Sequence, residues 1–321
     1  MMLSILFTIF DGIRDLLKNL LGFRRRCESK TRLDHKVVVI TGGNTGIGKE
    51  TALQLTLRGA KVIIGCRDLK KGENAVKDIK CLNAKADINV MQLDLSSLSS
   101  VRHFAKTLTQ NESRIDILIN NAGVMLCPEW TTEDGFEMQF GTNHLGHFLL
   151  TLSVMDLLKK SAKARVINVS SKAYFTGEIN FENINLRNGA YSPIKGYSQS
   201  KLANILFTRE LARRLGPKNT ITAYSLHPGI IQTELGRHIP ALIQPIIRYV
   251  FGYMMLSIEL GAQTTLYCAL EPSLDNESGL YYDDCHRIDN MFANATNDTD
   301  AQKLWELSCD LVKLDTHLRL D

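Results

Sequence analysis

Residues 36–50 read KVVVITGGNTGIGKE, and this stretch is the strongest indication of the fold class. An apolar run of strand type ends in a glycine-rich turn, and an amphipathic stretch of helical period follows. Glycines permit a tight turn and the close approach of a pyrophosphate, which then lies on the N–H groups and positive dipole end of a helix. An ordinary glycine-rich turn is the alternative. Standing between strand and helix, the motif predicts a dinucleotide-binding turn, with contacts from Gly42, Asn44, Thr45, Gly46, Ile47 and Gly48.

Alternating elements continue outward from this turn to the C-terminus. Short apolar runs are separated by longer amphipathic ones, which is the pattern of strands joined by helical crossovers. Such crossovers are right-handed and give a parallel sheet covered by helices on both faces. We therefore predict an α/β fold, a doubly wound parallel sheet of Rossmann type, whose ligand lies at the carboxyl ends of the strands. The predicted strands are residues 36–41, 61–65, 88–94, 115–120, 165–170, 220–226 and 279–282.

The composition is that of one globular unit in a reducing compartment. The chain has 321 residues, 44% of them hydrophobic, and no linker rich in proline or serine divides residues 33–321, so we predict one domain there. A formal net charge of only +4 leaves a nucleic-acid partner without its electrostatic footprint. The seven cysteines are scattered and never form a C-x-x-C pair, so neither a disulfide framework nor a zinc site is indicated.

Residues 1–23, MMLSILFTIFDGIRDLLKNLLGF, have the pattern of an amphipathic helix. Charged residues interrupt the apolar run before the roughly 18 residues that a membrane span needs. On a helix, the polar residues share an arc of about 160° and the opposite face is almost wholly apolar. Because Arg24, Arg25 and Arg26 follow and can reach anionic headgroups, residues 1–30 are predicted to be an anchor lying in the membrane interface. Packing on the domain itself or on a second subunit is the alternative.

The end of the second predicted strand, Gly65-Cys66-Arg67-Asp68, stands where such sheets read the adenine ribose of a dinucleotide. An acidic residue there accepts the ribose 2′-hydroxyl and favours NAD, whereas a guanidinium can fork onto a 2′-phosphate. Arg67 therefore favours NADP(H) over NAD(H), and Lys71 is a weaker candidate for the same role. Asp68 argues the other way, and a solvated turn is the alternative role of Arg67.

Two further motifs give the chain a family resemblance. Asn120-Asn121-Ala122-Gly123 follows the fourth predicted strand, and Tyr197-Ser198-Gln199-Ser200-Lys201 comes later. With the glycine turn, they resemble the short-chain dehydrogenase/reductase family from residue 36 to the C-terminus. NHLGHF at 143–148, SKLAN at 200–204 and HPG at 227–229 resemble its retinol dehydrogenase branch, whose members interconvert retinoids and related lipid carbonyls with NADP(H).

The chemistry that this resemblance implies needs a proton donor beside a carbonyl oxygen. Tyr197 suits the role, but the ordinary tyrosine pKa of about 10 is too high for exchange at neutral pH, so a nearby cation must lower it. Lys201, four residues on, shares the helical face and can supply that cation while holding the nicotinamide ribose. The resemblance makes Ser171 the residue that holds the substrate oxygen. It makes Asn143 the holder of a proton-relay water, with a polar helix cap or kink as the alternative.

The resemblance also assigns the remaining cofactor contacts. They are Asp94 at the adenine, Asn120, Ala122 and Gly123 along the adenosine and ribose, and Pro228, Gly229 and Thr233 at the nicotinamide carboxamide. His144 and His147 stand three apart on one helix, but no third ligand accompanies them and hydride transfer by this route needs no metal. We therefore expect core or surface histidines and no metal site.

Two segments bear on the substrate. Residues 176–193 form an insertion that the retinol dehydrogenase branch shares, and we expect it to overhang the site. Residues 239–260, IPALIQPIIRYVFGYMMLSIEL, are too apolar for ordinary exposed surface. They predict a lid over a lipid-shaped pocket, with a homodimer interface as the alternative.

Together these features predict an NADP(H)-dependent oxidoreductase that interconverts a lipophilic alcohol and its carbonyl, of the retinol and retinal kind. A steroid or fatty-aldehyde oxidoreductase is the first alternative. A non-catalytic nucleotide-binding scaffold on a lipid surface is the second, and Ser171, Tyr197 and Lys201 argue against it. The anchor favours the endoplasmic reticulum or lipid droplets, with the catalytic domain facing the cytosol. A mitochondrial location is disfavoured because transit peptides are poor in acidic residues.

Overall fold

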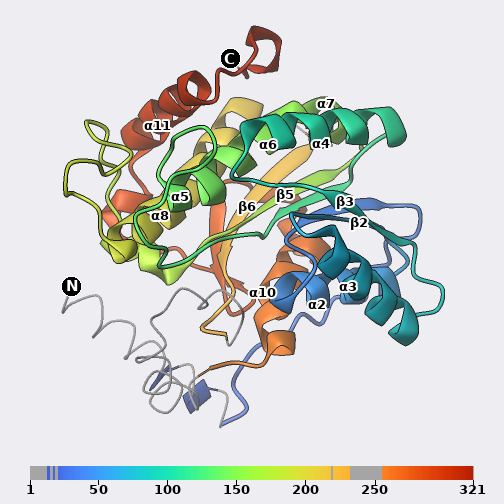
Figure 1. Ribbon diagram of the computed structural model, residues 1–321. Helices are drawn as coiled ribbons and strands as arrows, with labels where there is room; N and C mark the ends of the chain where they lie inside the picture. The colour runs from blue at the N-terminus through green and yellow to red at the C-terminus, as the bar shows by residue number, and fades with distance from the viewer. Residues whose placement is uncertain (1–12, 15–16, 19–20, 218–219, 232–254, 321) are drawn as a thin grey trace.

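The computed structural model describes residues 13–14, 17–18, 21–217, 220–231 and 255–320. A central sheet lies between two layers of helices (Figure 1). Its eight strands follow the order β3-β2-β1-β4-β5-β6-β7-β8, and all neighbours are parallel except β7 and β8. The doubly wound parallel sheet predicted from the sequence is confirmed. The strands are β1 (Val37–Thr41), β2 (Lys61–Cys66), β3 (Ile88–Gln92), β4 (Ile117–Asn120), β5 (Ala164–Val169), β6 (Ile221–His227), β7 (Leu280–Asp283) and β8 (His286–Arg287).

The sheet is buried on both faces, and β1 shows how. Val37 and Val39 belong to the hydrophobic cluster on one side of the sheet, and Val38 and Ile40 to the cluster on the other. All five residues of β1 are buried. Successive side chains of a strand point to opposite faces, so a strand covered on both sides is apolar along most of its length.

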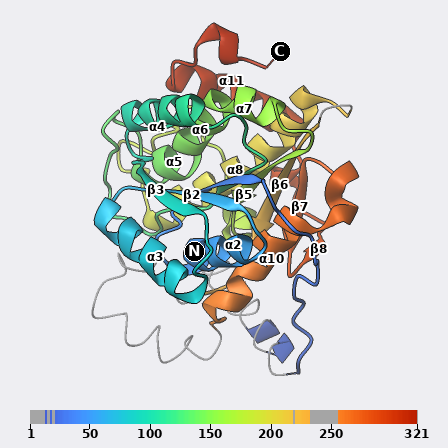
Figure 2. The same cartoon turned by 90° about the vertical axis from the view of Figure 1, so that its right-hand side faces the viewer.

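Helices cover the two faces in two groups (Figures 1 and 2). One group packs into the cluster of Val37 and Val39 and the other into that of Val38 and Ile40. The first contains α4 (Leu98–Asn111), α6 (Gly146–Ser153), α7 (Met155–Lys159), α8 (Pro193–Leu215) and α11 (Asp298–Leu311). The second contains α2 (Gly46–Leu57), α3 (Leu69–Leu82) and α10 (Ile258–Leu270). Short helical pieces are α5 (Met138–Phe140), η1 (Gly141–Leu145), η2 (Lys172–Thr176), η5 (Pro272–Asn276), η6 (Ala293–Ala295) and η7 (Thr316–Leu318).

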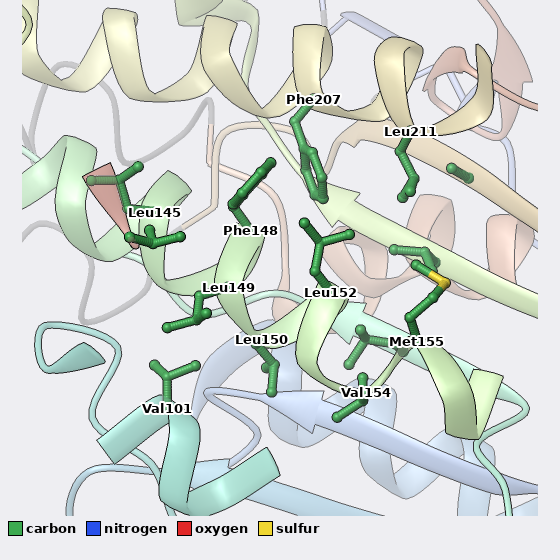
Figure 3. Close-up of a cluster of buried hydrophobic side chains, with 14 of the residues drawn as sticks. Val101, Leu145, Phe148, Leu149, Leu150, Leu152, Val154, Met155, Phe207 and Leu211 are labelled. Atoms are coloured by element: carbon green, nitrogen blue, oxygen red, sulfur yellow. The ribbon is translucent and has the colours of Figure 1, made fainter. Parts of the chain in front are cut away.

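α8 is held on the sheet by close packing of large side chains. Figure 3 shows Phe148 and Leu152 of α6 directed toward Phe207 and Leu211 of α8. The ring centroid of Phe148 lies 5.3 Å from that of Phe207 and 5.1 Å from that of Trp305 in α11, both edge-on. Such aromatic pairs contribute roughly 1 kcal/mol beyond the apolar area they bury. The helix therefore has a fixed position relative to the strand ends.

Two predicted segments fall mostly outside the described residues. They are the amphipathic helix of residues 1–23 and the apolar stretch 239–260. In the described part of the first, Ile13, Leu17, Leu21 and Phe23 are 46%, 51%, 63% and 70% exposed. Within the ranges that the structure describes, no helix combines the length and the apolarity needed to cross a membrane.

Candidate active site

The turn after β1 is built for a close approach of backbone groups. Gly42 has φ +67°, and a Cβ atom there would lie 2.9 Å from the Cα and Cβ atoms of Ala122. A Cβ atom at Gly48 would lie 2.4 Å from the carbonyl oxygen of Gly42. Thr45, the N-cap of α2, makes no side-chain hydrogen bond to the helix. The first N–H groups of α2 therefore keep their capacity for an anion such as a pyrophosphate.

Thr41 connects this turn to the loop after β4. Its hydroxyl oxygen accepts the N–H groups of Asn121 at 2.9 Å and Ala122 at 3.0 Å, and it lies 2.8 Å from Nε2 of His147. The Asn121 side chain donates to the carbonyl oxygen of Thr41 at 2.8 Å. Because the hydroxyl accepts two N–H groups, its one hydrogen is directed to Nε2. His147 therefore carries its proton on Nδ1, which donates to the carbonyl oxygen of Asn143 at 2.9 Å.

Burial supports this tautomer of His147. It lowers the pKa of the imidazole to about 4, although the bond to the Asn143 carbonyl opposes the change. The ring is therefore neutral at physiological pH. Sequence analysis predicts no role for Thr41 or Asn121 and expects His147 to be a core or surface histidine. All three stand inside motifs that were read for other residues, and only the fold brings them together.

The predicted contacts after β4 lie partly inside the sheet and partly at its carboxyl edge. They are Asn120, Ala122 and Gly123. Asn120 is buried within the sheet, where its Nδ2 donates to the Asn168 Oδ1 at 2.7 Å and to the Thr151 hydroxyl at 3.0 Å. Ala122 and Gly123 lie at the carboxyl edge. A Cβ atom on Gly123 would lie 3.3 Å from Asn143 Oδ1 and 3.7 Å from Lys201 Nζ. The loop therefore passes directly over the catalytic candidates.

Arg67 and Asp68, the two residues that follow β2, have different surroundings. Arg67 is exposed, whereas Oδ1 of Asp68 accepts the N–H group of Lys71 at 3.0 Å and so caps α3. The carboxylate that would favour a ribose 2′-hydroxyl is thus already engaged by a helix N-terminus.

Asp94 lies just beyond the end of β3. Its Oδ1 accepts hydrogen bonds from the N–H group of Ser96 at 2.9 Å and from the Ser96 hydroxyl at 2.6 Å. Its own N–H group donates to the Ser100 hydroxyl at 2.9 Å. The carboxylate is thereby fixed at the carboxyl edge of the sheet, on the side of the glycine turn.

Ser171, Tyr197 and Lys201 come together as the sequence predicts. Ser171 follows β5 as the N-cap of η2, and its hydroxyl hydrogen-bonds that of Tyr197. Lys201 lies one helical turn beyond Tyr197 in α8, with Nζ 5.7 Å from the Tyr197 ring centroid. Nζ donates to the carbonyl oxygen of Val169 at 3.0 Å, so the last carbonyl of β5 holds the lysine at the strand end.

Burial dominates the titration of the pair in α8. It raises the pKa of Tyr197 to about 12, although the hydrogen bond from Ser171 opposes the change. It also lowers the pKa of Lys201 to about 8. Tyr197 is thus a protonated phenol at neutral pH, and Lys201 is a cation close to its titration point. The lowering of the pKa of Tyr197 by Lys201 stays a prediction, since the net change is upward and arises from burial, opposed by Ser171.

Asn143 uses its side chain to hold the loop after β4. Oδ1 accepts the N–H group of Val124 at 2.8 Å, and Nδ2 donates to the Val124 carbonyl at 2.9 Å and to the Ser200 hydroxyl at 2.9 Å. The residue stands in η1, a π-helical piece of the kind that often marks functional sites. The side-chain amide is thus engaged by Val124 and Ser200, and the role of Asn143 in holding a relay water stays a prediction.

His144 and His147 are both core residues. Nε2 of His144 lies 2.9 Å from the Ser308 hydroxyl, and the ring packs among the phenylalanines of α5, α6 and α8. Among the described residues, no group of three or more His, Cys, Asp or Glu side chains could hold a metal ion.

The turn after β6 contributes Pro228 and Gly229, while Thr233 lies outside the described residues. Gly229 has φ +97°, and a Cβ atom there would lie 2.4 Å from the Leu256 side chain and 2.8 Å from Nη2 of Arg24. Ile231 and Leu256 form a parallel bridge, so both ends of the stretch between them meet beside this turn.

The insertion of residues 176–193 lies against the start of α8. Gln199, between Tyr197 and Lys201, accepts the Asn180 N–H at 3.0 Å and donates to the Ile184 carbonyl at 2.8 Å. The Tyr191 hydroxyl donates to the Cys127 carbonyl at 2.6 Å. The insertion thus joins α8 to the loop that follows β4, and its position over the substrate stays a prediction.

The geometry assembles a hydroxyl donor, a phenol and a buried cation beside a phosphate-binding turn. The Ser171 hydroxyl lies within hydrogen-bonding reach of the Tyr197 hydroxyl and opposes the effect of burial on its pKa. Both belong to the carboxyl edge of the sheet, where ligands of such folds bind. The arrangement can hold a carbonyl or alcohol oxygen and exchange a proton with it.

Comparison with known proteins agrees with this geometry. A family model described as short chain dehydrogenase matches residues 36–242. Human retinol dehydrogenase 11 is 48% identical over 288 residues, which cover 90% of this chain and 89% of that protein. Mouse retinol dehydrogenase 14 is 49% identical over 286 residues, covering 85% and 84%.

Solved structures show the same architecture. A protein from Mycobacterium paratuberculosis has a TM-score of 0.72 at 38% identity, covering 88% of this chain and 95% of that one. A complex of RhlG from Pseudomonas aeruginosa with NADP at its active site has a TM-score of 0.63 at 25% identity, covering 78% and 95%. The chain therefore belongs to the short-chain dehydrogenase/reductase family, within its retinol dehydrogenase branch, and is an oxidoreductase that binds a nicotinamide cofactor and interconverts alcohols and carbonyls.

Proposed function

We propose that this protein uses NADP(H) to interconvert a lipophilic alcohol and its carbonyl, of the retinol and retinal kind. The observation that carries the proposal is the joined pair of hydroxyl groups, Ser171 and Tyr197, beside the buried Lys201. The names of the relatives support the substrate class, since retinol dehydrogenases 11 and 14 act on that class by name.

The residues at the carboxyl edge fit a dinucleotide. The glycine turn leaves no room for side chains at Gly42 and Gly48, and the first N–H groups of α2 face the same space. Gly46, Asp94 and Gly123 border the path from there to Lys201. When bound, the cofactor supplies or receives the hydride at the substrate carbon.

Each catalytic side chain then has one task. Ser171 donates a hydrogen bond to the substrate oxygen, which fixes the carbonyl beside Tyr197. The Tyr197 hydroxyl gives its proton to that oxygen during reduction and takes it back during oxidation. Lys201, held by the Val169 carbonyl, places a positive charge beside the phenol and stabilises the tyrosinate that forms.

The preference for NADP(H) rests on the end of β2. Arg67 is exposed and can fork onto a 2′-phosphate, whereas the carboxylate of Asp68 caps α3. The solved neighbour with NADP at its active site is consistent with this choice.

A membrane surface is the proposed location, with the endoplasmic reticulum or lipid droplets as the compartment and the catalytic domain in the cytosol. Ile13, Leu17, Leu21 and Phe23 are exposed apolar side chains within ten residues or so of one another, which is unusual for a surface in water. A lipophilic substrate dissolves in the same phase that these side chains favour.

Activity assays test the proposal and its alternatives. The purified protein is mixed with NADPH and with retinal, a steroid ketone or a long-chain aldehyde, and the loss of NADPH absorbance is followed. Retinal should be reduced fastest. A higher kcat/KM for the steroid or the fatty aldehyde would assign the alternative substrate class, and NADPH binding without turnover on any of them would assign the scaffold.

Replacing Tyr197 by Phe tests the catalytic assignment within the same assay. The change removes only the transferable proton, so turnover should fall by roughly 10²- to 10⁴-fold while NADPH still binds. Tyr267→Phe in α10 is the matched control and should leave turnover unchanged. Wild-type turnover by the Tyr197→Phe variant would refute the assignment.

A further inference from the structure

Two adjacent aspartates at the end of β7 are deeply buried. The side chains of Asp283 and Asp284 are only 5% and 2% exposed. They follow the strand at the carboxyl edge of the sheet, since Asp283 pairs with His227 at the end of β6. A buried carboxylate is costly unless positive charges or N–H donors surround it. A segment that supplies these partners must therefore lie against the two carboxylates.

The partners of Asp284 come from the N-terminal segment, defined here as the described residues among 13–26. Lys18 Nζ lies 2.8 Å from Oδ2 of Asp284, and Arg24 Nε lies 3.5 Å from Oδ1. The N–H group of Arg25 donates to the same Oδ1 at 3.2 Å. Three groups of one segment thus converge on a single carboxylate more than 250 residues away in the sequence.

Asp283 joins the same segment to the catalytic strand end. Its Oδ2 lies 2.8 Å from Nζ of Lys172, the residue after Ser171, and 3.7 Å from Nη2 of Arg14. Arg24 also lies against Gly229 in the turn after β6. The segment therefore docks where β5, β6 and β7 end, rather than on a remote face of the domain. Figure 2 shows the dark-blue stretch that follows it running up beside α10 and β8.

The side chains that do not dock point to solvent. They are the apolar Ile13, Leu17, Leu21 and Phe23, and Arg25 is exposed beside them. Arg26 pairs with Glu259 at 2.6 Å, next to Ile258, whose side chain is also exposed. The outward surface is thus apolar with a cationic border, which fits a membrane containing anionic lipid.

We propose that Asp283 and Asp284 form a docking site for the N-terminal segment and thereby fix the catalytic domain on a lipid surface with its strand carboxyl edge toward the bilayer. The segment is then more than a tether, because its cations pair with Asp284, its Arg14 shares Asp283 with Lys172, and its apolar side chains set the direction that the domain faces. The orientation rests on the proposed membrane function, whereas the docking does not.

Hydrogen exchange of the full-length protein tests the docking in solution. Asp284→Asn keeps the shape of the residue and suits its φ of +51°, because asparagine tolerates the left-handed region. Without the carboxylate, the backbone of residues 21–28 should exchange about tenfold faster. Lys18→Gln removes one partner from the other side and should give a smaller increase in the same peptide. Asp289→Asn, at an exposed aspartate paired with Arg287, is the matched control and should change nothing.

The same variants on vesicles of phosphatidylcholine and phosphatidylserine test the orientation. Wild-type protein should float with the vesicles and show slowed exchange at residues 21–28, 228–231 and 255–260, with α4 unaffected. Asp284→Asn should still float but lose the protection at 228–231 and 255–260. Unchanged exchange at 21–28 in solution would overturn the docking. Unchanged protection of the variant on vesicles would overturn the orientation, and a wild-type protein that does not float would overturn the membrane function and the orientation together.

Discussion

Tyr197 and Lys201 owe their positions to the backbone as much as to their spacing in α8. The Val169 carbonyl at the end of β5 holds Nζ of Lys201, and the serine two residues later meets the Tyr197 hydroxyl. Burial then raises the pKa of Tyr197 and lowers that of Lys201, so the phenol keeps its proton at neutral pH and the lysine is a cation below about pH 8. The strand end thus sets the geometry of the pair, and burial sets its protonation.

The pH dependence of carbonyl reduction should report Lys201. Its pKa of about 8 lies far below the ordinary lysine value because of burial, whereas Tyr197 at about 12 keeps its proton throughout. Lys201 is a cation below pH 8, so kcat should be level there and fall as the pH rises through about 8, when the charge that stabilises the tyrosinate is lost. Steady-state rates from pH 6 to pH 10 measure this. A level profile up to pH 10 would contradict the role, and Lys201→Arg should move the fall to higher pH.

Arg67→Asp should shift the cofactor preference from NADPH toward NADH. A carboxylate repels the 2′-phosphate and accepts the 2′-hydroxyl, so the ratio of kcat/KM for NADPH to that for NADH should fall by at least about tenfold. Lys70→Asp makes the same charge change three residues away and should alter the ratio little. An unchanged ratio in Arg67→Asp would assign the phosphate to another residue.

The site residues that could be predicted from the sequence are those that belong to a single local motif. The glycine turn, Tyr197, Lys201 and Ser171 could be placed from spacing and from the order of strands. The capping of α3 by Asp68 and the engagement of the Asn143 amide with Val124 could not, because each depends on which of several polar partners the fold brings within reach. Asn120 was assigned to the cofactor, and its burial between Asn168 and Thr151 gives it a structural task as well.

At the scale of elements, one imidazole joins β1 to the helical run that begins in η1. His147 receives the Thr41 hydroxyl at Nε2 and donates from Nδ1 to the Asn143 carbonyl. These two hydrogen bonds thereby hold β1, which ends in the glycine turn, in a fixed position relative to η1. The contact between Thr41 and His147 cannot be predicted from the sequence, because the two residues are 106 positions apart.

His147→Phe should therefore lower stability without a change of charge. The substitution leaves the Thr41 hydroxyl hydrogen and one carbonyl bond of Asn143 without partners in the interior. A buried polar group without a partner costs roughly 1–3 kcal/mol, so with two such groups the free energy of unfolding should fall by about 2–6 kcal/mol. Urea denaturation measures it, and His103→Phe on the exposed face of α4 is the control. Nitrogen NMR of wild-type protein should also show His147 protonated at Nδ1.

Element types were predictable where the apolar period was long. The seven predicted strands exist, with boundaries shifted by at most two residues, because each is a buried run between turn residues. β8 has only two residues and so carries no period. The π-helical η1 was not predictable either, since nothing in GTNHL distinguishes it from an ordinary helical turn.

At the scale of the whole molecule, exposed apolar side chains are concentrated near one edge. Four of the large hydrophobic residues that are exposed lie between positions 13 and 23, and Ile258 lies beside Glu259, the partner of Arg26. This surface adjoins the ends of β5, β6 and β7. The contacts run through Asp283, Asp284 and the Lys172 that pairs with Asp283. Membrane and cofactor sites would thus share one side of the protein.

Replacing the exposed apolar residues of the N-terminal segment should release the protein from vesicles. Each buried apolar side chain contributes roughly 1.5–3 kcal/mol, so Ser substitution of the four together should lower the vesicle-bound fraction by well over tenfold in flotation. The replaced residues are Ile13, Leu17, Leu21 and Phe23. Leu57, Leu69, Leu82 and Phe292, which are exposed elsewhere, are the matched control set. Equal release by both sets would show that the surface of the segment has no special affinity for lipid.

The bridge between Ile231 and Leu256 has a consequence for how this protein could change over time. The N–H group of Leu256 donates to the Ile230 carbonyl at 2.8 Å, so the described residues on either side of 232–254 meet in one closed stem. Loop-closure entropy varies only slowly with length, so a stem of this kind admits stretches of very different length and chemistry without disturbing the sheet. Exchange of residues 232–254 with the corresponding stretch of a relative would thus replace the chain between two points that the stem holds together. It offers a route by which substrate range could diversify while the hydroxyl pair and the cofactor turn stay unaltered.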